Sequence, residues 1–286
     1  MITSFQELHQ LVREATPKTV ALVAAEDPVL IEAATQAQQE GLAHFILFGN
    51  SRKIQSLIPP GIEGFKVIDS QNPAQDAIRQ IHAGQADLLM KGRIQTGELL
   101  RAVLDRDTGL RQGELLNHIA VIESPHYHKL LYISDGGINL HLDEHVFEQM
   151  VENITEYLKL LGHTRPHFGM MTLVETVSDK IPETVIAQKV VSALKNRVSI
   201  EGPIAPDVAL SRQAATKKGL KSEISGDIDV FLMPNTTAAN HLVKGLSALG
   251  GCKVSGVVVG AKAPIILLSR SDDAESKYRS ILLGLV

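Results

Sequence analysis

The most informative segment lies near the end of the chain and reads Gly256-Val-Val-Val-Gly-Ala-Lys262-Ala-Pro264-Ile-Ile-Leu-Leu-Ser269-Arg270-Ser-Asp272-Asp273-Ala-Glu275-Ser276-Lys277. Residues 256–260 and 264–268 are apolar runs that predict two buried strands separated by a tight turn. The second run stops at Ser269 and Arg270, and residues 272–283 then show helical spacing. The hydroxyl of Ser269 and the guanidinium of Arg270 are therefore predicted between the end of a buried strand and the start of a helix. Open α/β sheets bind their ligands at this position.

Strand-like and helix-like segments alternate along the first part of the chain. The strand-like runs are 19–25, 44–49, 65–69 and 86–90, and the helical segments between and after them are 28–39, 54–57, 73–82 and 96–104. This alternation is the pattern of a parallel sheet that helices cover on both faces. The fold class is therefore α/β.

The alternation breaks after Leu110, where two strand-like runs, 118–123 and 129–134, follow each other closely. Their short link, Ser124-Pro-His-Tyr-His128, suits an antiparallel hairpin and marks a domain boundary. The alternation then resumes. It has helices at 143–161, 182–195 and 237–249, strands at 168–174, 198–200, 228–233 and 254–259, and a turn at 201–207 that leads into a further helix.

Composition excludes several classes of protein. The 286 residues carry a net charge of −4 with dispersed Lys and Arg, and Trp is absent, which argues against nucleic-acid binding. A single cysteine, Cys252, excludes an internal disulfide and fits a reducing compartment. No signal peptide is visible, and no apolar run approaches the roughly 20 residues of a membrane span. We therefore expect a cytoplasmic protein without a membrane partner.

Searches for familiar catalytic motifs fail. The eleven histidines form no set with cysteines or carboxylates that would complete a metal site, so no metal is expected. Neither a P-loop, a G-x-G-x-x-G loop nor a G-x-S-x-G elbow is present. Ser269 is followed by an arginine and has no neighbouring histidine that would activate it as a nucleophile.

Polar residues gather instead at the ends of the predicted strands. They are Lys91, Thr96, Arg101, Asp135, Asn139, Asn235, Asn240, Lys262, Ser269 and Arg270. Each one alone is explained as a cap or turn residue. Together they would line a cleft rich in arginine and amide groups, which suits a phosphorylated small molecule. The residues alone thus indicate an anion-binding α/β enzyme.

The same segments make the family recognisable. They are Leu89-Met-Lys91-Gly92, Thr96, Leu99-Leu-Arg101-Ala-Val-Leu104, Gly109-Leu-Arg111, Ser134-Asp135, Asn139, Glu201-Gly202-Pro203, Asp207, Gly226-Asp227-Ile-Asp229, Pro234-Asn235, Asn240, Gly260-Ala-Lys262-Ala-Pro264 and Ser269-Arg270-Ser-Asp272. In this order, over nearly the whole chain, they resemble the phosphate acetyl/butyryl transferase family, most closely its butyryl branch.

The resemblance implies the reaction acyl-CoA + phosphate ⇌ CoA + acyl phosphate, by direct thiolate attack in a ternary complex. Coenzyme A would be a substrate, and no tightly bound cofactor is expected. The fold would comprise two αβα domains with the active site in the cleft between them. The first domain would consist of residues 1–112 and 257–286, the second of residues 113–256. A homo-oligomer, at least a dimer, is also expected.

The resemblance also implies roles for individual residues. Arg101 and Arg270 would hold the phosphate, and Ser269 would orient the reacting groups or supply a hydrogen bond to the oxyanion. The remaining substrate-binding candidates are Lys91, Thr96, Asp135, Asn139, Asn240 and Lys262.

The general base is the weak point of this mechanism. The acetyl branch has a catalytic aspartate where this chain has Ser276, and Glu275 is the nearest carboxylate. One residue is roughly 100° around a helix, so Glu275 need not reach the same point. Glu275 is the predicted base, with Asp272, Asp273, a CoA phosphate or water as alternatives. The bland interpretation of these acidic residues is that they interact favourably with the helix dipole.

Three other functions stay open at this point. Acetyl-CoA could be the substrate in place of a butyryl thioester. A non-catalytic protein that binds CoA or acyl phosphate could tolerate the loss of Arg101 or Ser269, yet both are present. A dehydrogenase of the isocitrate type would need an aspartate cluster and a nucleotide loop that the sequence lacks.

Overall fold

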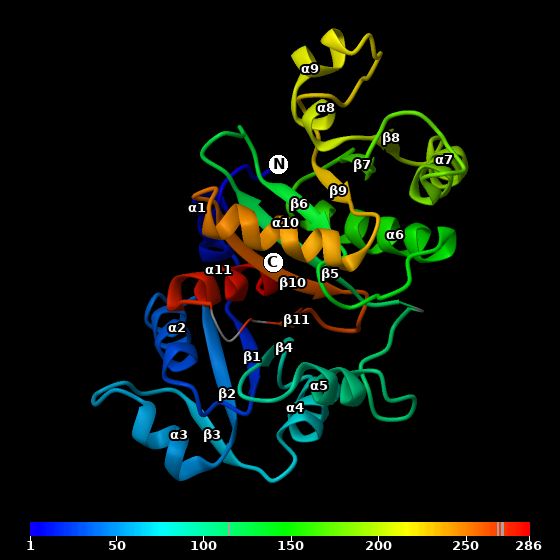
Figure 1. The fold of residues 1–286 in the computed structure, drawn as a ribbon. Coiled ribbons are helices and arrows are strands. Elements are labelled where there is room, and N and C mark those ends of the chain that lie inside the picture. Colours follow the sequence, from blue (N-terminus) through cyan, green and yellow to red (C-terminus); the bar gives the residue numbers. More distant parts are fainter. Residues whose placement is uncertain (114, 268, 270–271) are drawn as a thin grey trace. The chain divides into compact units, whose positions relative to one another are not determined.

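A computed structural model describes residues 1–113, 115–267, 269 and 272–286 of the chain (Figure 1). They form two compact units. The first unit contains Phe5–Glu114 and Ser255–Val286, and the second contains Met1–Ser4 and Leu115–Val254. The first four residues therefore lie with the second unit, whereas the sequence assigned them to the first. The backbone amide of Ile2 donates to the carbonyl of Leu161, 3.0 Å away, which attaches the N-terminus there.

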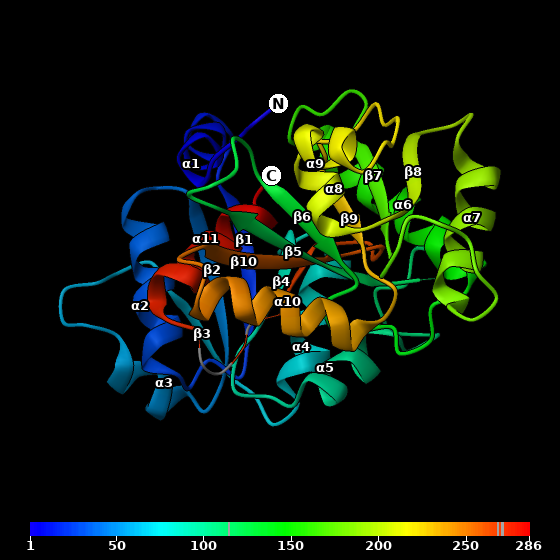
Figure 2. The same ribbon diagram turned by 45° about the horizontal axis from the view of Figure 1, so that its top comes forward.

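The first unit is built on a mostly parallel sheet with the strand order β3-β2-β1-β4-β11-β10. The strands are β1 (Lys18–Val23), β2 (Ala43–Gly49), β3 (Lys66–Asp69), β4 (Leu88–Lys91), β10 (Lys253–Val259) and β11 (Ile265–Ile266). Its helices are α1 (Phe5–Glu14), α2 (Pro28–Gln39), α3 (Ser51–Leu57), α4 (Pro73–His82), α5 (Thr96–Val103) and α11 (Ala274–Gly284). Only the β10–β11 pair is antiparallel among these strands. Helices α2 and α11 pack side by side (Figures 1 and 2).

The order of these strands creates a ligand position. From β1 the chain runs through α2, β2, α3 and β3 to one side, and α4 then returns it to β4 on the other side of β1. Such a reversal of strand order opens a crevice at the carboxyl ends of the two central strands. Here these ends are Val23 and Lys91, which are paired in register. The parallel strand β11 ends beside β4.

Gly92 holds the turn after β4 close to the end of β1. Its amide donates to the carbonyl of Val23 at 2.7 Å, and the amide of Arg93 donates to the carbonyl of Ala24 at 2.7 Å. A Cβ atom at Gly92 would overlap both of these carbonyl oxygens. Ala24 itself has a φ of 52°, a left-handed conformation that is strained for a residue with a side chain. Glycine is therefore required at position 92.

Replacing Gly92 with Ala is expected to lower the free energy of unfolding by about 1–3 kcal/mol, because the added methyl group pushes two paired backbone segments apart. Urea unfolding would measure this change. Gly97→Ala is the matched control, since a Cβ there meets no atom within 4 Å and helix propensity favours Ala by about 1 kcal/mol. Equal stability of the Gly92→Ala variant and the unchanged chain would contradict the expected overlap.

The second unit has the strand order β5-β6-β9-β7-β8. The strands are β5 (Asn117–Glu123), β6 (Leu131–Ser134), β7 (His167–Met171), β8 (Ser199–Ile204) and β9 (Val230–Leu232), and the helices are α6 (Glu144–Leu160), α7 (Pro182–Leu194), α8 (Pro206–Leu210), α9 (Arg212–Lys217) and α10 (Thr236–Ala248). The pair β5–β6 is antiparallel, as the short link predicts, and the other pairs are parallel. Helix α10 packs on β6 (Figure 2).

Several expected elements differ from the structure. Strand β8 continues to Ile204 through the expected turn, because β8 is the edge strand and Pro203 there need not donate to a neighbour. The helix after it is divided into α8 and α9 at Ser211, whose side chain accepts from the amide of Ala214 and caps α9. Strand β11 is only two residues long, and β7 ends at Met171, earlier than expected.

Of the helices in the described ranges, none combines the length and the apolar character of a membrane span.

Candidate active site

A cavity of about 380 Å³ lies in the first unit. Its lining residues lie at or follow the carboxyl ends of the parallel strands β4 and β11 or belong to the helices α2 and α11. They are Asp27, Leu30, Lys91, Gly92, Arg93, Ser269 and Lys277. Lys91 ends β4, and Ser269 follows β11. The structure thus brings together two of the site residues that the sequence predicts, Lys91 and Ser269, at the crevice that the strand order creates.

Two lysines of this cavity are buried. The side chain of Lys91 extends from the end of β4, and the residue is 5% exposed. Its Nζ donates to the carbonyl of Gly92 at 3.3 Å. Lys277, near the start of α11, is 3% exposed. Arg93 also lines the cavity but is exposed. Cations therefore dominate the charged groups at this place.

The start of α2 forms another part of the wall. Asp27 is its N-cap, and one carboxylate oxygen accepts from the amides of Val29 at 2.9 Å and Leu30 at 3.3 Å. Pro28 at the first helical position needs no donor partner and has a φ suited to the helix. Because a helix N-terminus carries partial positive charge, α2 adds to the positive potential of the cavity.

The backbone at Ser269 is held by Asp272. The Ser269 amide donates to Oδ2 of Asp272 at 2.8 Å, and the Asp272 amide donates to the carbonyl of Ser269 at 3.2 Å. Ser269 is exposed, so its hydroxyl is accessible to a ligand in the cavity. Arg270, the predicted phosphate ligand beside it, lies outside the described residues.

The carboxylates proposed as the general base are engaged by other groups. Asp273 caps α11 by accepting from the amide of Ser276 at 2.8 Å, and this hydrogen bond lowers the pKa of Asp273. Glu275 forms an ion pair with Arg279, and its side chain is 71% exposed. Glu275 is not among the residues that line the cavity. The identity of the base stays a prediction.

Three predicted residues of the second unit shape one turn: Asp135 and Asn139 belong to it, and Asn240 bonds to it from α10. Asp135 is fully buried, and its carboxylate accepts from the amides of Gly137 at 2.9 Å and Asn139 at 2.9 Å. The Asn139 side chain donates to the carbonyl of Leu116 at 2.8 Å, and the Asn240 side chain donates to the carbonyl of Gly136 at 3.3 Å. These bonds account for the shape of the turn, and a role in substrate binding stays a prediction.

Three further predicted residues, Thr96, Arg101 and Lys262, are exposed in the first unit and do not line the cavity. Sequence reasoning missed Asp27, Arg93 and Lys277 as cavity residues. Lys277 carried a signal, because a cation near the start of a helix opposes the helix dipole. Within the described ranges, no group of three or more His, Cys, Asp or Glu side chains is arranged to hold a metal.

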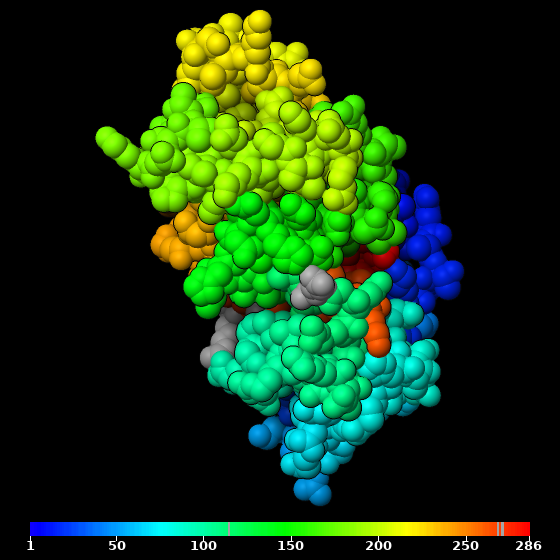
Figure 3. Space-filling model, turned by 90° about the vertical axis from the view of Figure 1, so that its right-hand side faces the viewer, coloured from blue at the N-terminus to red at the C-terminus, as the bar shows by residue number. Residues whose placement is uncertain are grey.

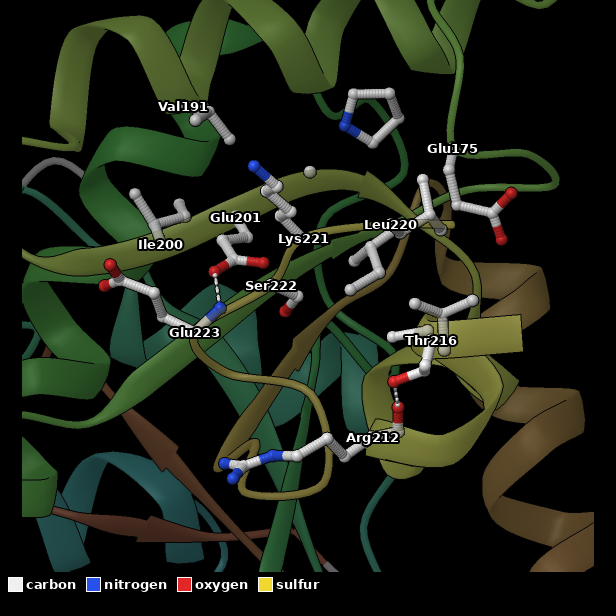
Figure 4. Close-up of a pocket in the computed structure, with 15 residues that line it drawn as sticks. Glu175, Val191, Ile200, Glu201, Arg212, Thr216, Leu220, Lys221, Ser222 and Glu223 are labelled. Atoms are coloured by element: carbon white, nitrogen blue, oxygen red, sulfur yellow. Dashed lines mark hydrogen bonds between the residues drawn. The ribbon is translucent and has the colours of Figure 1, made fainter. Parts of the chain in front are cut away.

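A second cavity, of about 770 Å³, lies in the second unit between β8, α9 and the segment 220–223 (Figure 4). Two of its three acidic side chains have partners: Glu175 lies 2.8 Å from Lys218, and Glu201 accepts from the amide of Glu223 at 2.7 Å. On the surface, the yellow-green atoms of α7 and β8 adjoin the yellow atoms of α8 and α9 (Figure 3). None of the site residues predicted from the sequence lines this cavity.

A family model described as phosphate acetyl/butaryl transferase matches residues 63–284. The chain belongs to this family. The resemblance that its motifs indicate is therefore confirmed, and the chain is a phosphate acyltransferase.

Related proteins are similar over almost the full length. The chain is 34% identical to the phosphate butyryltransferase of Clostridium acetobutylicum, covering 99% of this chain and 98% of the relative. It is also 34% identical to the phosphate acetyltransferase of Thermotoga maritima, covering 94% and 95%. The solved structure of a branched-chain phosphotransacylase from Enterococcus faecalis V583 superposes with a TM-score of 0.84 at 28% identity, covering 94% and 98%. The predicted α/β fold class is confirmed.

Proposed function

We propose that this family member catalyses acyl-CoA + phosphate ⇌ CoA + acyl phosphate with a butyryl or similar short or branched acyl group. The observation that supports this most is the cavity beyond the ends of β4 and β11, which Ser269 and two buried lysines line together. Such a site suits an acyl group attached to a phosphate, because it offers a hydrogen-bond donor beside cations. The choice of a butyryl or branched acyl group is supported by the Enterococcus and Clostridium relatives, which are named for branched-chain and butyryl substrates.

In this mechanism the thiolate of CoA attacks the carbonyl carbon of the acyl phosphate directly. The carbonyl oxygen becomes an oxyanion, to which Ser269 donates a hydrogen bond. The bond from carbon to the phosphate oxygen then breaks, and phosphate leaves with its electron pair. In the reverse direction a phosphate oxygen attacks the thioester and CoA leaves as the thiolate. Arg101 and Arg270 would hold the phosphate as bidentate partners.

A base must remove the thiol proton, because a thiol with a pKa near 8.5 is mostly protonated at neutral pH. Glu275 is the candidate that the sequence favours. To act, its carboxylate would have to leave Arg279, with which it pairs. Asp272, Asp273, a CoA phosphate or water are the alternatives. A homo-oligomeric state, the active-site position in a cleft and the roles of the remaining polar residues also stay predictions.

Acetyl-CoA is the competing substrate, since the Thermotoga relative of equal identity is named a phosphate acetyltransferase. The test is CoA release from butyryl-, isobutyryl- and acetyl-CoA, each with and without phosphate. We expect phosphate-dependent release that is fastest with the butyryl or branched thioester. Fastest release from acetyl-CoA would support the alternative, and no phosphate-dependent release with any thioester would refute the transferase proposal.

Arg270→Lys is expected to raise the KM for phosphate about 10- to 100-fold. A guanidinium can donate two charged hydrogen bonds to phosphate in a bidentate contact, and the ammonium of lysine cannot reproduce both, so one of them is lost. Steady-state kinetics with varied phosphate would measure this. Arg52→Lys, on the exposed surface of α3, is the matched control and should leave the KM unchanged. An unchanged phosphate KM for Arg270→Lys would remove Arg270 from this role.

A further inference from the structure

We propose that Lys277 binds a phosphate group of the reactants in the cavity of the first unit, together with Lys91. This inference rests on the proposed function, because that function supplies the phosphorylated ligands. It assigns a role to a residue that is outside the predicted arginine pair and outside the predicted substrate-binding residues. The burial of Lys277, its place in α11 and the charge balance of the cavity support it.

Lys277 is a buried cation that lacks an anionic partner in the described chain. It is 3% exposed and lines the cavity, and none of the ion pairs between described residues includes it. In the same helix, Arg279 pairs with Glu275. Burial of an ammonium group is strongly unfavourable unless an anion or several hydrogen bonds compensate it. A ligand anion would provide this compensation.

The position of Lys277 in α11 makes the same point. The N-cap is Asp273, so Lys277 lies at the end of the first helical turn. A cation at this end of a helix is unfavourable because it faces the positive pole of the dipole. Nothing in the local sequence therefore favours a lysine at 277. Its side chain contributes to the cavity wall, and we attribute the presence of a lysine at this position to the ligand of that cavity.

The charges of the cavity fit a dianion. Among the described residues that line the cavity, Lys91, Arg93 and Lys277 are cationic and Asp27 is the one carboxylate, so these side chains carry an excess of two positive charges. The Asp27 carboxylate is turned to the first amides of α2. A phosphate group carries about two negative charges near neutral pH and has three oxygen acceptors for ammonium groups.

Two reactants carry such a group. One source is inorganic phosphate, which is also the phosphoryl end of the acyl phosphate, and the other is a phosphate of CoA. Both present the same chemistry to an ammonium group. Calorimetric titrations with inorganic phosphate, with CoA and with pantetheine, the thiol arm of CoA without its phosphates, distinguish the two.

The decisive variant is Lys277→Met, which keeps most of the volume and removes the charge. We expect this variant to bind one ligand about 10- to 100-fold more weakly, which is the effect of losing one charged hydrogen bond. The ligand affected is either inorganic phosphate or CoA, and in the second case binding of pantetheine should not change. Lys277→Arg keeps the charge and should stay within about tenfold of the original affinity. Lys53→Met, an exposed lysine of α3, should bind both ligands unchanged.

Thermal unfolding adds a readout that a merely structural lysine would not produce. Phosphate should raise the Tm of the unchanged protein, because a ligand that binds only the folded state stabilises it. In Lys277→Met the Tm without ligand should be equal or higher, since an uncompensated buried charge is gone, and the rise with phosphate or CoA should be largely lost. If this variant does not fold, Lys277→Gln is titrated in its place.

The outcomes separate the two proposals. Weaker phosphate binding assigns Lys277 to inorganic phosphate, and weaker CoA binding with unchanged pantetheine binding assigns it to a CoA phosphate. Unchanged affinity for both ligands in a folded, charge-free variant would overturn the inference, even if the enzyme turns over acyl-CoA. Conversely, binding that depends on Lys277 in a protein without acyl transfer would retain the inference and reject the proposed reaction.

Discussion

Replacing Ser269 with Ala should lower kcat for phosphate-dependent CoA release by about 100- to 1,000-fold, the usual effect of removing one donor to an oxyanion. The physical reason is that the hydroxyl would interact most strongly with charge that develops on the carbonyl oxygen in the transition state. The KM values should change little, because the ground-state carbonyl carries little charge. Initial rates over a range of both substrates would measure the two effects separately.

The matched control for this substitution is Ser56→Ala. Ser56 lies in α3 of the same unit, and its hydroxyl donates to the carbonyl of Lys53 within one turn of the helix. Its removal should leave kcat unchanged. The backbone bonds between Ser269 and Asp272 do not involve the serine side chain, so Ser269→Ala should fold normally. An unchanged kcat in a folded Ser269→Ala variant would exclude this hydroxyl from transition-state stabilisation.

Lys129→Met should destabilise the second unit by about 3–5 kcal/mol, because it leaves an uncompensated carboxylate in the interior. The Lys129 ammonium lies 2.7 Å from Oδ1 of Asp229 and 3.0 Å from Oδ1 of Asp227. Lys129 and Asp229 are 4% and 2% exposed, so water cannot replace the lost partner. Neighbouring His163 is buried as well, and this burial lowers the pKa of its imidazole. Urea unfolding would measure the free energy.

Two further variants test the cause of this loss. Adding Asp229→Asn to Lys129→Met removes both charges and should recover a large part of the stability, as double-mutant cycles show for coupled pairs. Lys159→Met removes an ammonium that is 2.8 Å from Glu156 on the surface of α6, and its cost should stay below about 1 kcal/mol. A similar loss in Lys129→Met and Lys159→Met would contradict the argument from burial.

The α/β fold was predictable because its signals are local. The near-continuous apolar run of β2 predicts a buried strand, and the helical spacing of apolar residues in α4 predicts a helix. Each pattern can be recognised within one short segment of the sequence. The short link after Glu123 predicted the antiparallel hairpin for the same reason. The prediction of a turn at 201–207 was wrong, because β8 continues to Ile204. Only the order of the strands shows that β8 is an edge strand, where a proline is tolerated.

The candidate site divides in the same way. From the sequence alone came the family, the strand-end position of Lys91 and Ser269, and the closing stretch as the part that carries Ser269. The partners of the charged groups required the tertiary structure. Glu275 and Lys277 are two residues apart, yet one is exposed and paired with Arg279 while the other is buried in the cavity. Burial and pairing depend on which distant segments pack against each helix face, and no local pattern in the chain encodes that.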